Sequence, residues 1–393
     1  MERLNLFAPD VRSNPYPHYA NLRRNAPVAQ IDPGGIWAVS RYDDVLAVLK
    51  NHAVFSSEGM RAMTIQPWLP HNPIADSMIL MDPPQHTQLR GLISGAFSSR
   101  VIPRIEPLAR EVSASFAARV LDGGEVDVSQ EIAATLPAAV IADLLGFDRA
   151  LCARFRAWSD DVAAVNPGTP PEARSRIVAT VAELERYIRT VIADRRSARR
   201  DDLVSDLLDA KVDGKHLDDR ELVAFLLLLL IAGFETTSHL LTNSLRVLAD
   251  HPALIERLRA EPAAIPAFIE EVLRYDPPVH GTARITTQDT RLAGVDLPRG
   301  SFVLALIGSA GRDESKMEAP DSFILDRKQR VSVPFGHGAH VCLGAALARI
   351  EARIALTTLL PRIRGVRLTA EPTWNLVMTV RGPTSCRMQF QAA

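Results

Sequence analysis

The chain has 393 residues, of which 47% are hydrophobic and 23% are charged, the balance of a folded protein with a large apolar core. Its 45 basic and 46 acidic side chains give a formal net charge of -1, so no overall field favours nucleic acid or an anionic membrane as a partner. Three scattered cysteines are too few for a disulfide framework, and the N-terminal residues contain no basic and apolar signal sequence. These features predict a cytoplasmic protein.

Apolar residues at helical spacing dominate the chain and predict a mainly α protein with small β-sheets near its two ends. The predicted helices, in chain order, are residues 43–50, 85–97, 102–121, 130–145, 171–197, 220–250, 253–275 and 345–360. The predicted strands are residues 36–40, 291–292, 302–307 and 376–381. Since no internal repeat or long low-complexity linker interrupts this pattern, we expect a single domain over residues 1–393.

The most apolar run, residues 222–234, is LVAFLLLLLIAGF. It is well short of the roughly 20 apolar residues that span a bilayer. A helix that is apolar on all sides and too short to span is typical of a large core. We therefore expect a buried helix and no membrane span.

The stretch that most needs an explanation is residues 333–351, VPFGHGAHVCLGAALARIE. It places Cys342 just ahead of a predicted helix, where the positive end of the helix dipole favours a thiolate. Its glycines permit tight turns and a close approach of the main chain to a bulky group. A thiolate in this position is a nucleophile or a metal ligand.

Several sites compete for this cysteine, besides a small buried core residue. Zinc could use His337, His340 and Cys342, but a structural zinc site wants four ligands. An iron–sulfur cluster normally needs four cysteines, and a cysteine hydrolase needs a paired basic histidine that is not evident here. A haem iron needs only one thiolate, so haem fits the spacing best, with the other sites still open.

The pattern Phe335-x-x-Gly338-x-His340-x-Cys342-x-Gly344 resembles the haem-binding loop of the cytochrome P450 monooxygenases, in particular the soluble bacterial type. The Leu-Ala-Arg-x-Glu that often follows this loop is present at residues 347–351. The resemblance implies one large helical domain with a minor β-rich region and haem b (iron protoporphyrin IX) sandwiched between two buried helices. Cys342 would be the axial ligand of the iron.

Residues 232–237, Ala-Gly-Phe-Glu-Thr-Thr, lie inside the most apolar predicted helix. An acid and two hydroxyls cost several kcal/mol in such a place if they are unpaired, so a surface position at a helix end is a weak explanation. The stretch resembles the oxygen-activating helix of the same family. The resemblance implies catalytic roles for Thr236, which would hydrogen-bond to the oxygen, and Glu235, which would help to relay protons.

Glu271-Val-Leu-Arg274 alone is an ordinary helical ion pair. It also resembles the buried Glu-x-x-Arg of the family, which a later arginine joins. The stretch 320–327 matches that later pattern and ends at Arg327. The implied role is structural.

Asp82-Pro-x-x-His86-x-x-x-Arg90 places His86 and Arg90 four residues apart, on one face of a predicted helix. A polar outer face explains this equally well without context. In the family the pattern binds the haem propionates, and Arg284 and His340 match two further propionate-binding positions. His337 has no role in the resemblance, and we expect it to pack or hydrogen-bond within its loop.

The resemblance implies a monooxygenase that inserts one atom of O2 into a C–H or C=C bond of a small, mainly apolar organic substrate. Electrons would come from NAD(P)H only indirectly, through a ferredoxin or flavodoxin and its reductase, since the chain leaves no room for a flavin domain. We expect a monomer. The substrate pocket is expected among residues 60–79, 166–176, 279–282 and 376–379.

Two other functions remain open. The chain could be a haem-thiolate protein of different chemistry, such as a peroxygenase, isomerase or dehydratase, or a haem sensor without catalysis. The intact Glu235 and Thr236 favour the monooxygenase.

Overall fold

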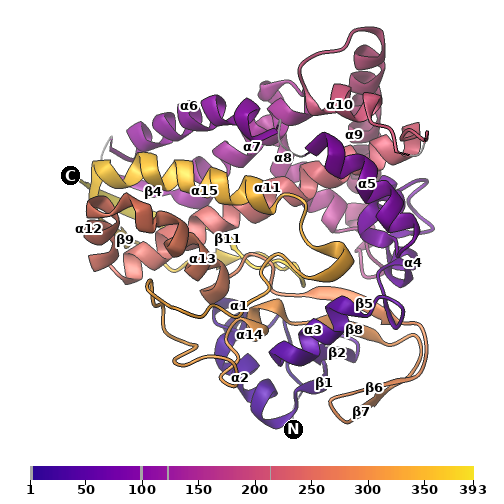
Figure 1. The fold of residues 1–393 in the computed structure, drawn as a ribbon, viewed down its shortest axis with the longest axis horizontal. Helices are drawn as coiled ribbons and strands as arrows, with labels where there is room; N and C mark the ends of the chain where they lie inside the picture. Colours follow the sequence, from indigo (N-terminus) through magenta and orange to yellow (C-terminus); the bar gives the residue numbers. More distant parts are fainter. Residues whose placement is uncertain (1–2, 98–100, 122–123, 213) are drawn as a thin grey trace. The chain divides into compact units, whose positions relative to one another are not determined.

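The computed structural model describes residues 3–97, 101–121, 124–212 and 214–393 (Figure 1). They form two compact units, which are described separately. Unit 1 comprises Met1–Phe55, Ala109–Leu136 and Thr236–Ala393, and unit 2 comprises Ser56–Leu108 and Pro137–Glu235. The single domain over residues 1–393 stays a prediction.

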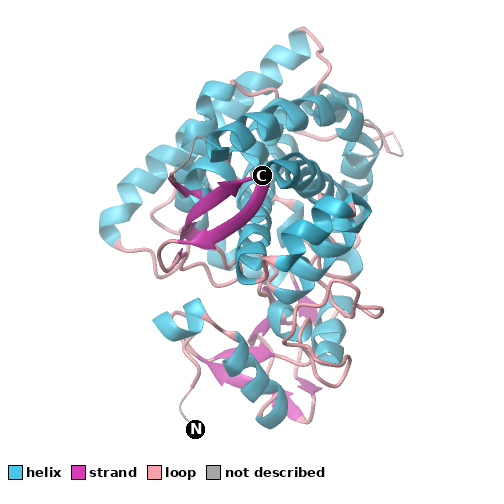
Figure 2. Ribbon diagram, turned by 90° about the vertical axis from the view of Figure 1, so that its left-hand side faces the viewer, coloured by secondary structure: helices cyan, strands magenta, loops and turns pink. Residues whose placement is uncertain are grey.

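Unit 1 contains the β-structure. Its largest sheet has the order β1-β2-β8-β5-β3, in which β2 and β8 run parallel while β1 pairs with β2 and β5 with β8 antiparallel. The strands of this sheet are β1 (Val28–Ile31), β2 (Ile36–Val39), β8 (Phe302–Ala305), β5 (Thr282–Thr286) and β3 (Phe55–Ser56). A second sheet, near the C-terminus in Figure 2, has the order β4-β12-β9. It is made of β4 (Glu125–Asp127), β12 (Arg387–Ala392) and β9 (Ile363–Leu368), and two hairpins pair β6 (Thr290–Leu292) with β7 (Val295–Leu297) and β10 (Thr373–Trp374) with β11 (Pro383–Ser385).

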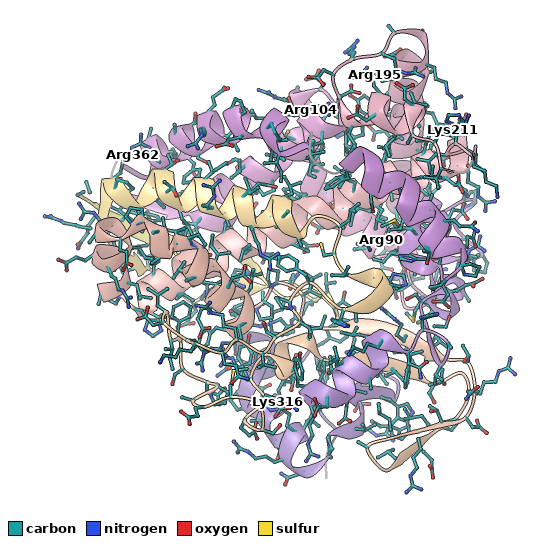
Figure 3. All side chains as sticks on the ribbon, in the orientation of Figure 1. Arg90, Arg104, Arg195, Lys211, Lys316 and Arg362 are labelled. Carbon is teal, nitrogen blue, oxygen red and sulfur yellow. The ribbon has the colours of Figure 1, made fainter. Side chains whose placement is uncertain are left out.

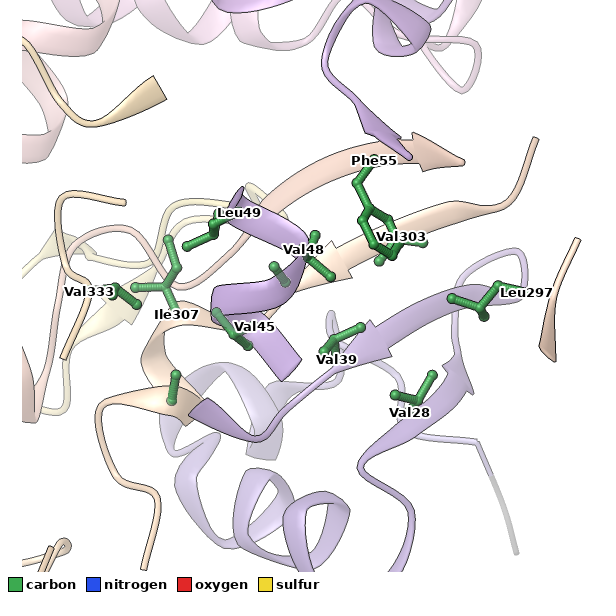
Figure 4. Packing of buried hydrophobic residues seen from close by; sticks show 12 residues of the cluster. Val28, Val39, Val45, Val48, Leu49, Phe55, Leu297, Val303, Ile307 and Val333 are labelled. Atoms are coloured by element: carbon green, nitrogen blue, oxygen red, sulfur yellow. The ribbon is translucent and has the colours of Figure 1, made fainter. Parts of the chain in front are cut away.

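The larger sheet is anchored by an apolar cluster (Figure 4). Helix α3 (Tyr42–Lys50) contributes Val45, Val48 and Leu49 to it, against Val39 and Val303 of the sheet. The aliphatic residues of α3 recur at helical spacing and those of the strands alternate, so each element buries one face. The end of α3 is thereby fixed in place, and it adjoins the Cys342 loop.

The other helices of unit 1 are short, except for α15. They are α1 (Pro9–Ser13), α2 (Tyr16–Asn25), α12 (Ala253–Ala260), α13 (Ile265–Tyr275), α14 (Ile307–Ala310) and α15 (Ala345–Leu359). Helices α13 and α15 pack on each other.

Unit 2 is built from helices. They are α4 (Arg61–Thr64), α5 (Gln85–Phe97), α8 (Cys152–Ala163), α9 (Pro171–Ser197) and α10 (Leu203–Asp209), and three more continue into unit 1, namely α6 (Val101–Leu121), α7 (Thr135–Leu145) and α11 (Asp219–Asp250). Helices α8 and α9 pack together, and buried Asp161 of α8 accepts a hydrogen bond from the Thr180 hydroxyl of α9 at 2.6 Å. Among the arginines labelled in Figure 3, Arg104 pairs with Asp206 at 3.1 Å and Arg195 is buried beside Asp202.

The fold class is confirmed, and most predicted helices lie within a residue or two of their observed bounds. Three predictions were wrong. Residues 253–275 are not one helix, because Pro262 begins a 3-10 turn between α12 and α13. Residues 130–145 begin within a π-helical turn, Val128–Ile132, before α7 starts at Thr135. Residues 376–381 form no strand, and only Val380 makes an isolated bridge, with Val279.

Two described segments, Val128–Leu145 and Asp219–Asp250, are long and apolar enough to cross a membrane by length and composition alone. In each, 67% of the most apolar window is buried within the protein. The apolar run at 222–234 therefore belongs to a helix of 32 residues rather than a short one. Its burial is that of a core helix, so these segments are weak evidence for a span.

Candidate functional site

The Cys342 loop of unit 1 is a closed turn whose shape depends on its glycines. The Cys342 N–H donates to the Phe335 carbonyl at 2.8 Å, which closes the loop three residues before α15 begins. Gly336 and Gly338 have φ values of 73° and 72°, in the left-handed region that favours glycine. A Cβ on Gly338 would lie 2.8 Å from the Leu49 carbonyl oxygen at the end of α3. The loop therefore has one close-packed side, and glycine is required there.

Exposure distinguishes Cys342 from the other two cysteines, all three of which the structure describes. Cys342 is exposed, Cys152 is half-buried and its thiol donates to the Ala138 carbonyl at 3.4 Å, and Cys386 is fully buried. Burial raises the pKa of the Cys152 thiol and raises that of Cys386 to about 12. Of the three, only Cys342 offers its sulfur to a large group.

A buried ion cluster joins α13 to Arg327, which precedes the Cys342 loop in the chain. Glu271 and Arg274 are both 0% exposed, and Arg274 donates to the Glu271 carboxylate at 2.7 and 3.0 Å. Arg327 donates to the same carboxylate at 3.0 Å, as the resemblance implied. Burial acts to raise the pKa of Glu271, but the hydrogen bonds and charges of its partners prevail and hold it below its usual value. The carboxylate therefore stays charged inside the core.

The neighbouring Glu270 links α13 to α15 and to the loop. The Arg349 guanidinium of α15 donates to the Glu270 carboxylate at 3.1 Å and lies 4.3 Å from the ring centre of Phe335. Arg349 is the arginine of the Leu-Ala-Arg-x-Glu pattern at residues 347–351, and the sequence alone predicts no contact for it. The structure shows that it fixes the aromatic residue at the start of the Cys342 loop.

Helix α11 carries the Glu235 and Thr236 pair on a face that is open. Its residues 222–227 are all buried, whereas Ala232 is exposed and Glu235 and Thr236 are half-buried. Ala232 lies three positions before Glu235 and four before Thr236, so it is next to both on the helix surface. At Gly233 a Cβ would lie 2.5 Å from the Ile141 side chain of α7, so this glycine lets α7 approach. A small residue exposed in mid-helix leaves space beside the two polar side chains.

The four predicted propionate ligands are divided between the units. His86, which is 1% exposed, and half-buried Arg90 lie on α5 of unit 2, where Figure 3 labels Arg90. In unit 1, Arg284 is 7% exposed on β5 and donates to the Thr282 hydroxyl at 3.0 Å, and half-buried His340 ends the 3-10 turn Gly338–His340. Their convergence on one group stays a prediction.

The donor set fits haem better than the other metals considered for Cys342. Among the described residues, no group of three or more His, Cys, Asp or Glu side chains could hold a metal ion. The zinc site of His337, His340 and Cys342 is therefore wrong. What the loop does provide is one accessible sulfur on a turn closed by its own main chain, with nothing within 4 Å of a Cβ at Gly344. One thiolate and an uncrowded approach are what a haem iron requires of a protein.

Comparison with known proteins is consistent with this geometry. A family model described as Cytochrome P450 matches residues 30–365. The chain is 39% identical over 355 residues to the erythromycin C-12 hydroxylase of Saccharopolyspora erythraea, covering 89% of this chain and 87% of the relative. It is 35% identical over 379 residues to the cyclomarin C epoxidase CymV of Salinispora arenicola, covering 94% of both. The solved structure of CYP109Q5 from Chondromyces apiculatus superimposes with a TM-score of 0.91 at 34% identity, covering 100% of this chain and 99% of that one.

Proposed function

The chain belongs to the cytochrome P450 family of monooxygenases, and from that premise we propose that Cys342 holds the haem iron and that Glu235 and Thr236 deliver protons to the reaction. The observation that carries the proposal is the Cys342 loop. It combines an exposed sulfur, a main-chain closure at Phe335 and a glycine packed on Leu49. Bound through a thiolate, haem b supplies the activation of O2 and the insertion of one oxygen atom into a C–H or C=C bond.

The residues of the chain bind and orient. The Cys342 thiolate would donate electron density to the iron, and its place just ahead of α15 puts it near the positive end of the helix dipole. The two propionates would be neutralised by His86 and Arg90 of α5 and by Arg284 and His340. A buried carboxylate needs such charged donors, and Arg284 supports the assignment because it is 7% exposed.

Glu235 and Thr236 would move protons. The Thr236 hydroxyl can donate a hydrogen bond and accept one at the same oxygen, so it can hold a proton at Oγ1 and pass it on. The Glu235 carboxyl, one residue earlier on α11, would reload it from solvent. Their half-buried state supports this role, because a relay has to meet both the reaction space and water.

The substrate would be a mainly apolar organic molecule, held by residues 60–79, 166–176, 279–282 and 376–379. Two relatives are named as an erythromycin C-12 hydroxylase and a cyclomarin C epoxidase, which supports an organic substrate. Electrons would come from NAD(P)H through a reductase and a ferredoxin or flavodoxin, and the protein would work as a cytoplasmic monomer.

The ligand claim is tested by the absorption of the reduced holoprotein under carbon monoxide. Thiolate ligation gives a far red-shifted Soret band, which Cys342→Ser should abolish and the control Cys152→Ser should retain. An unshifted band of the histidine type in the wild type would refute the thiolate. Turnover that depends on both NADPH and O2 separates a monooxygenase from a peroxygenase, an isomerase or a sensor.

A further inference from the structure

The loop between β10 and β11, residues 375–382, exposes an apolar tip above polar ends that are buried. Leu376 is 69% exposed, more than any other large hydrophobic residue in the described part of the chain. At the two ends of the loop, Asn375 is 8% exposed and Arg381 is 2% exposed. The ends of the loop are therefore buried while an apolar side chain at its tip is exposed, and binding residues often lie on loops that are held in this way.

Main-chain contacts close this loop and attach it to the segment after α13. The Asn375 N–H donates to the Gly382 carbonyl at 3.1 Å, and the Gly382 N–H donates back to the Asn375 side-chain oxygen at 3.2 Å. The Thr379 carbonyl accepts from the N–H groups of His280 and Gly281 at 2.8 and 3.1 Å. The loop is therefore held at its two ends and at Thr379, the last residue of the tip (residues 376–379).

The inside of the loop is filled by Arg12, which comes from the N-terminal helix α1. Its guanidinium donates to the Asn375 side-chain oxygen at 2.6 Å and to the carbonyls of Val377 and Val380 at 3.3 Å each. A planar guanidinium can serve several acceptors at fixed angles, which a lysine ammonium cannot. Arg12 therefore determines where the carbonyls of the tip point.

Arg381 makes the return contact from the loop to α1. It donates to the carbonyls of Arg12 and Ser13 at 2.8 and 2.6 Å, which caps the C-terminal end of the helix, and to the Asp276 carboxylate at 2.8 Å. Arg12 and Arg381 thus form a reciprocal clasp between the two ends of the chain.

Burying the charged side chains of the clasp costs desolvation free energy, so stability alone does not explain the clasp. Arg246 also donates to Asp276, at 2.9 Å, so Arg246 and Arg381 share one carboxylate, while Arg12 itself is 6% exposed. Burial, followed by the charge of Arg381, lowers the pKa of Arg12 to about 10. Apolar residues of similar volume often stabilise a core as well as buried charges do. What the clasp adds is a defined shape for an irregular loop.

We propose that Arg12 is a positioning residue for substrate, which fixes the 376–379 tip in the shape that an apolar substrate contacts. This inference rests on the proposed function, in which the tip contributes to the substrate pocket. Arg12 itself touches no substrate and acts through the carbonyls of Val377 and Val380.

The test compares Arg12→Gln with wild type as the haem-loaded protein, by two measurements. Hydrogen exchange reads the loop directly, and we expect the amides of Asn375, Arg381 and Gly382 to exchange about tenfold faster. The second measurement is the Kd of imidazole and of 4-phenylimidazole, followed in the absorption spectrum. Both ligands would bind the haem iron through an azole nitrogen, but only 4-phenylimidazole also extends into the pocket. We expect the Kd of 4-phenylimidazole to rise about tenfold while that of imidazole stays within about twofold, because only the larger ligand uses a preformed pocket.

Arg23→Gln is the matched control. Arg23, on α2, is also buried, at 2% exposed against 6% for Arg12, and it donates to Ser309 and Glu314. It should change neither the exchange of the loop nor the ratio of the two azole affinities. If Arg12→Gln does not fold with haem, Asn375→Ala removes the side-chain acceptor at the end of the loop and should give the same two changes.

Two results would overturn the proposal. Unchanged exchange in 375–382 would show that Arg12 does not hold the loop. Faster exchange with an unchanged azole ratio would show that the tip does not contact ligand. Both leave the thiolate band under carbon monoxide intact, so they are distinct from a failure of the proposed function.

Discussion

Glu351 of α15 should make the protein less stable as the pH rises. Its side chain is 1% exposed and lies on the same helical face as buried Leu347 and Ala355. Among the described residues, no group forms a hydrogen bond with its Oε2 atom. Burial alone raises its pKa from 4.5 to about 8, so in the folded protein it is a neutral acid near neutral pH.

The sign and size of this pH dependence follow from the difference between the pKa values of Glu351 in the folded and unfolded states. Below the pKa of the unfolded state the carboxyl is protonated in both states and has no effect. Between about 4.5 and about 8 the unfolded chain ionises it and the folded protein does not, so the free energy of unfolding falls by about 1.4 kcal/mol per pH unit. The upper bound is about 5 kcal/mol, reached near pH 8. If half of this free energy were lost, about 2.5 kcal/mol, the urea midpoint would fall by about 0.8 M at an m-value of about 3 kcal/mol/M.

The assay compares urea midpoints of wild type and Glu351→Gln at about pH 5 and about pH 8. Because glutamine stays neutral, the variant should match wild type at the lower pH and exceed it at the higher. The control variant is Glu172→Gln, at an exposed position of α9. Its urea midpoint should match that of wild type at both pH values. An equal difference at both pH values, or a variant that loses stability relative to wild type at pH 8, would show that Glu351 ionises in the fold.

Three further predictions follow from the site and its supports. Thr236→Ala should leave the thiolate band intact while electron consumption is uncoupled from product and peroxide is released; intact coupling would contradict the relay. Gly338→Ala should lower haem content, since its Cβ would meet the Leu49 carbonyl at 2.8 Å with φ at 72°, and a wild-type haem-to-protein ratio would argue against this packing. Burial acts to raise the pKa of Asp76, but the hydrogen bond from Arg220 and those of other partners lower it. The stability that Asp76 contributes is therefore present above pH 3.8 and is lost as the pH falls through the lowered pKa of the folded state. Asp76→Asn should speed proteolysis of residues 57–84 at pH 7, and its difference from wild type should shrink as the pH falls below 3.8.

The predictable part of the site consists of residues that are close in the chain. The Cys342 loop needs only its glycines and the start of α15, and the Glu235 and Thr236 pair stands out as polar residues within an apolar helix. The contact between Glu271 and Arg327 spans 56 residues. It came from the family resemblance, because no local periodicity points to it.

The clasp could not be predicted, for a physical reason. Arg381 and the Arg12 carbonyl are 369 residues apart, and an arginine near the N-terminus usually indicates a solvated surface. Alternation in residues 376–381 predicted a strand, since strands are the usual way to satisfy extended main chain. In this loop the Arg12 guanidinium donates to the carbonyls of Val377 and Val380, in place of the N–H groups of a neighbouring strand. No sequence pattern indicates that a distant arginine takes this role.

Different residues hold the Cys342 loop and the 376–379 tip. Substitutions could therefore change substrate specificity without changing the haem ligation. The Cys342 loop is held at Phe335 by Arg349, which pairs with Glu270. The 376–379 tip is held by Arg12, which donates to the Val377 carbonyl, and Arg381 at the end of the same loop donates to Asp276. Sites that share no partners have nearly additive energies. A substitution at Arg12 should therefore alter which substrates bind while leaving the thiolate ligation unchanged.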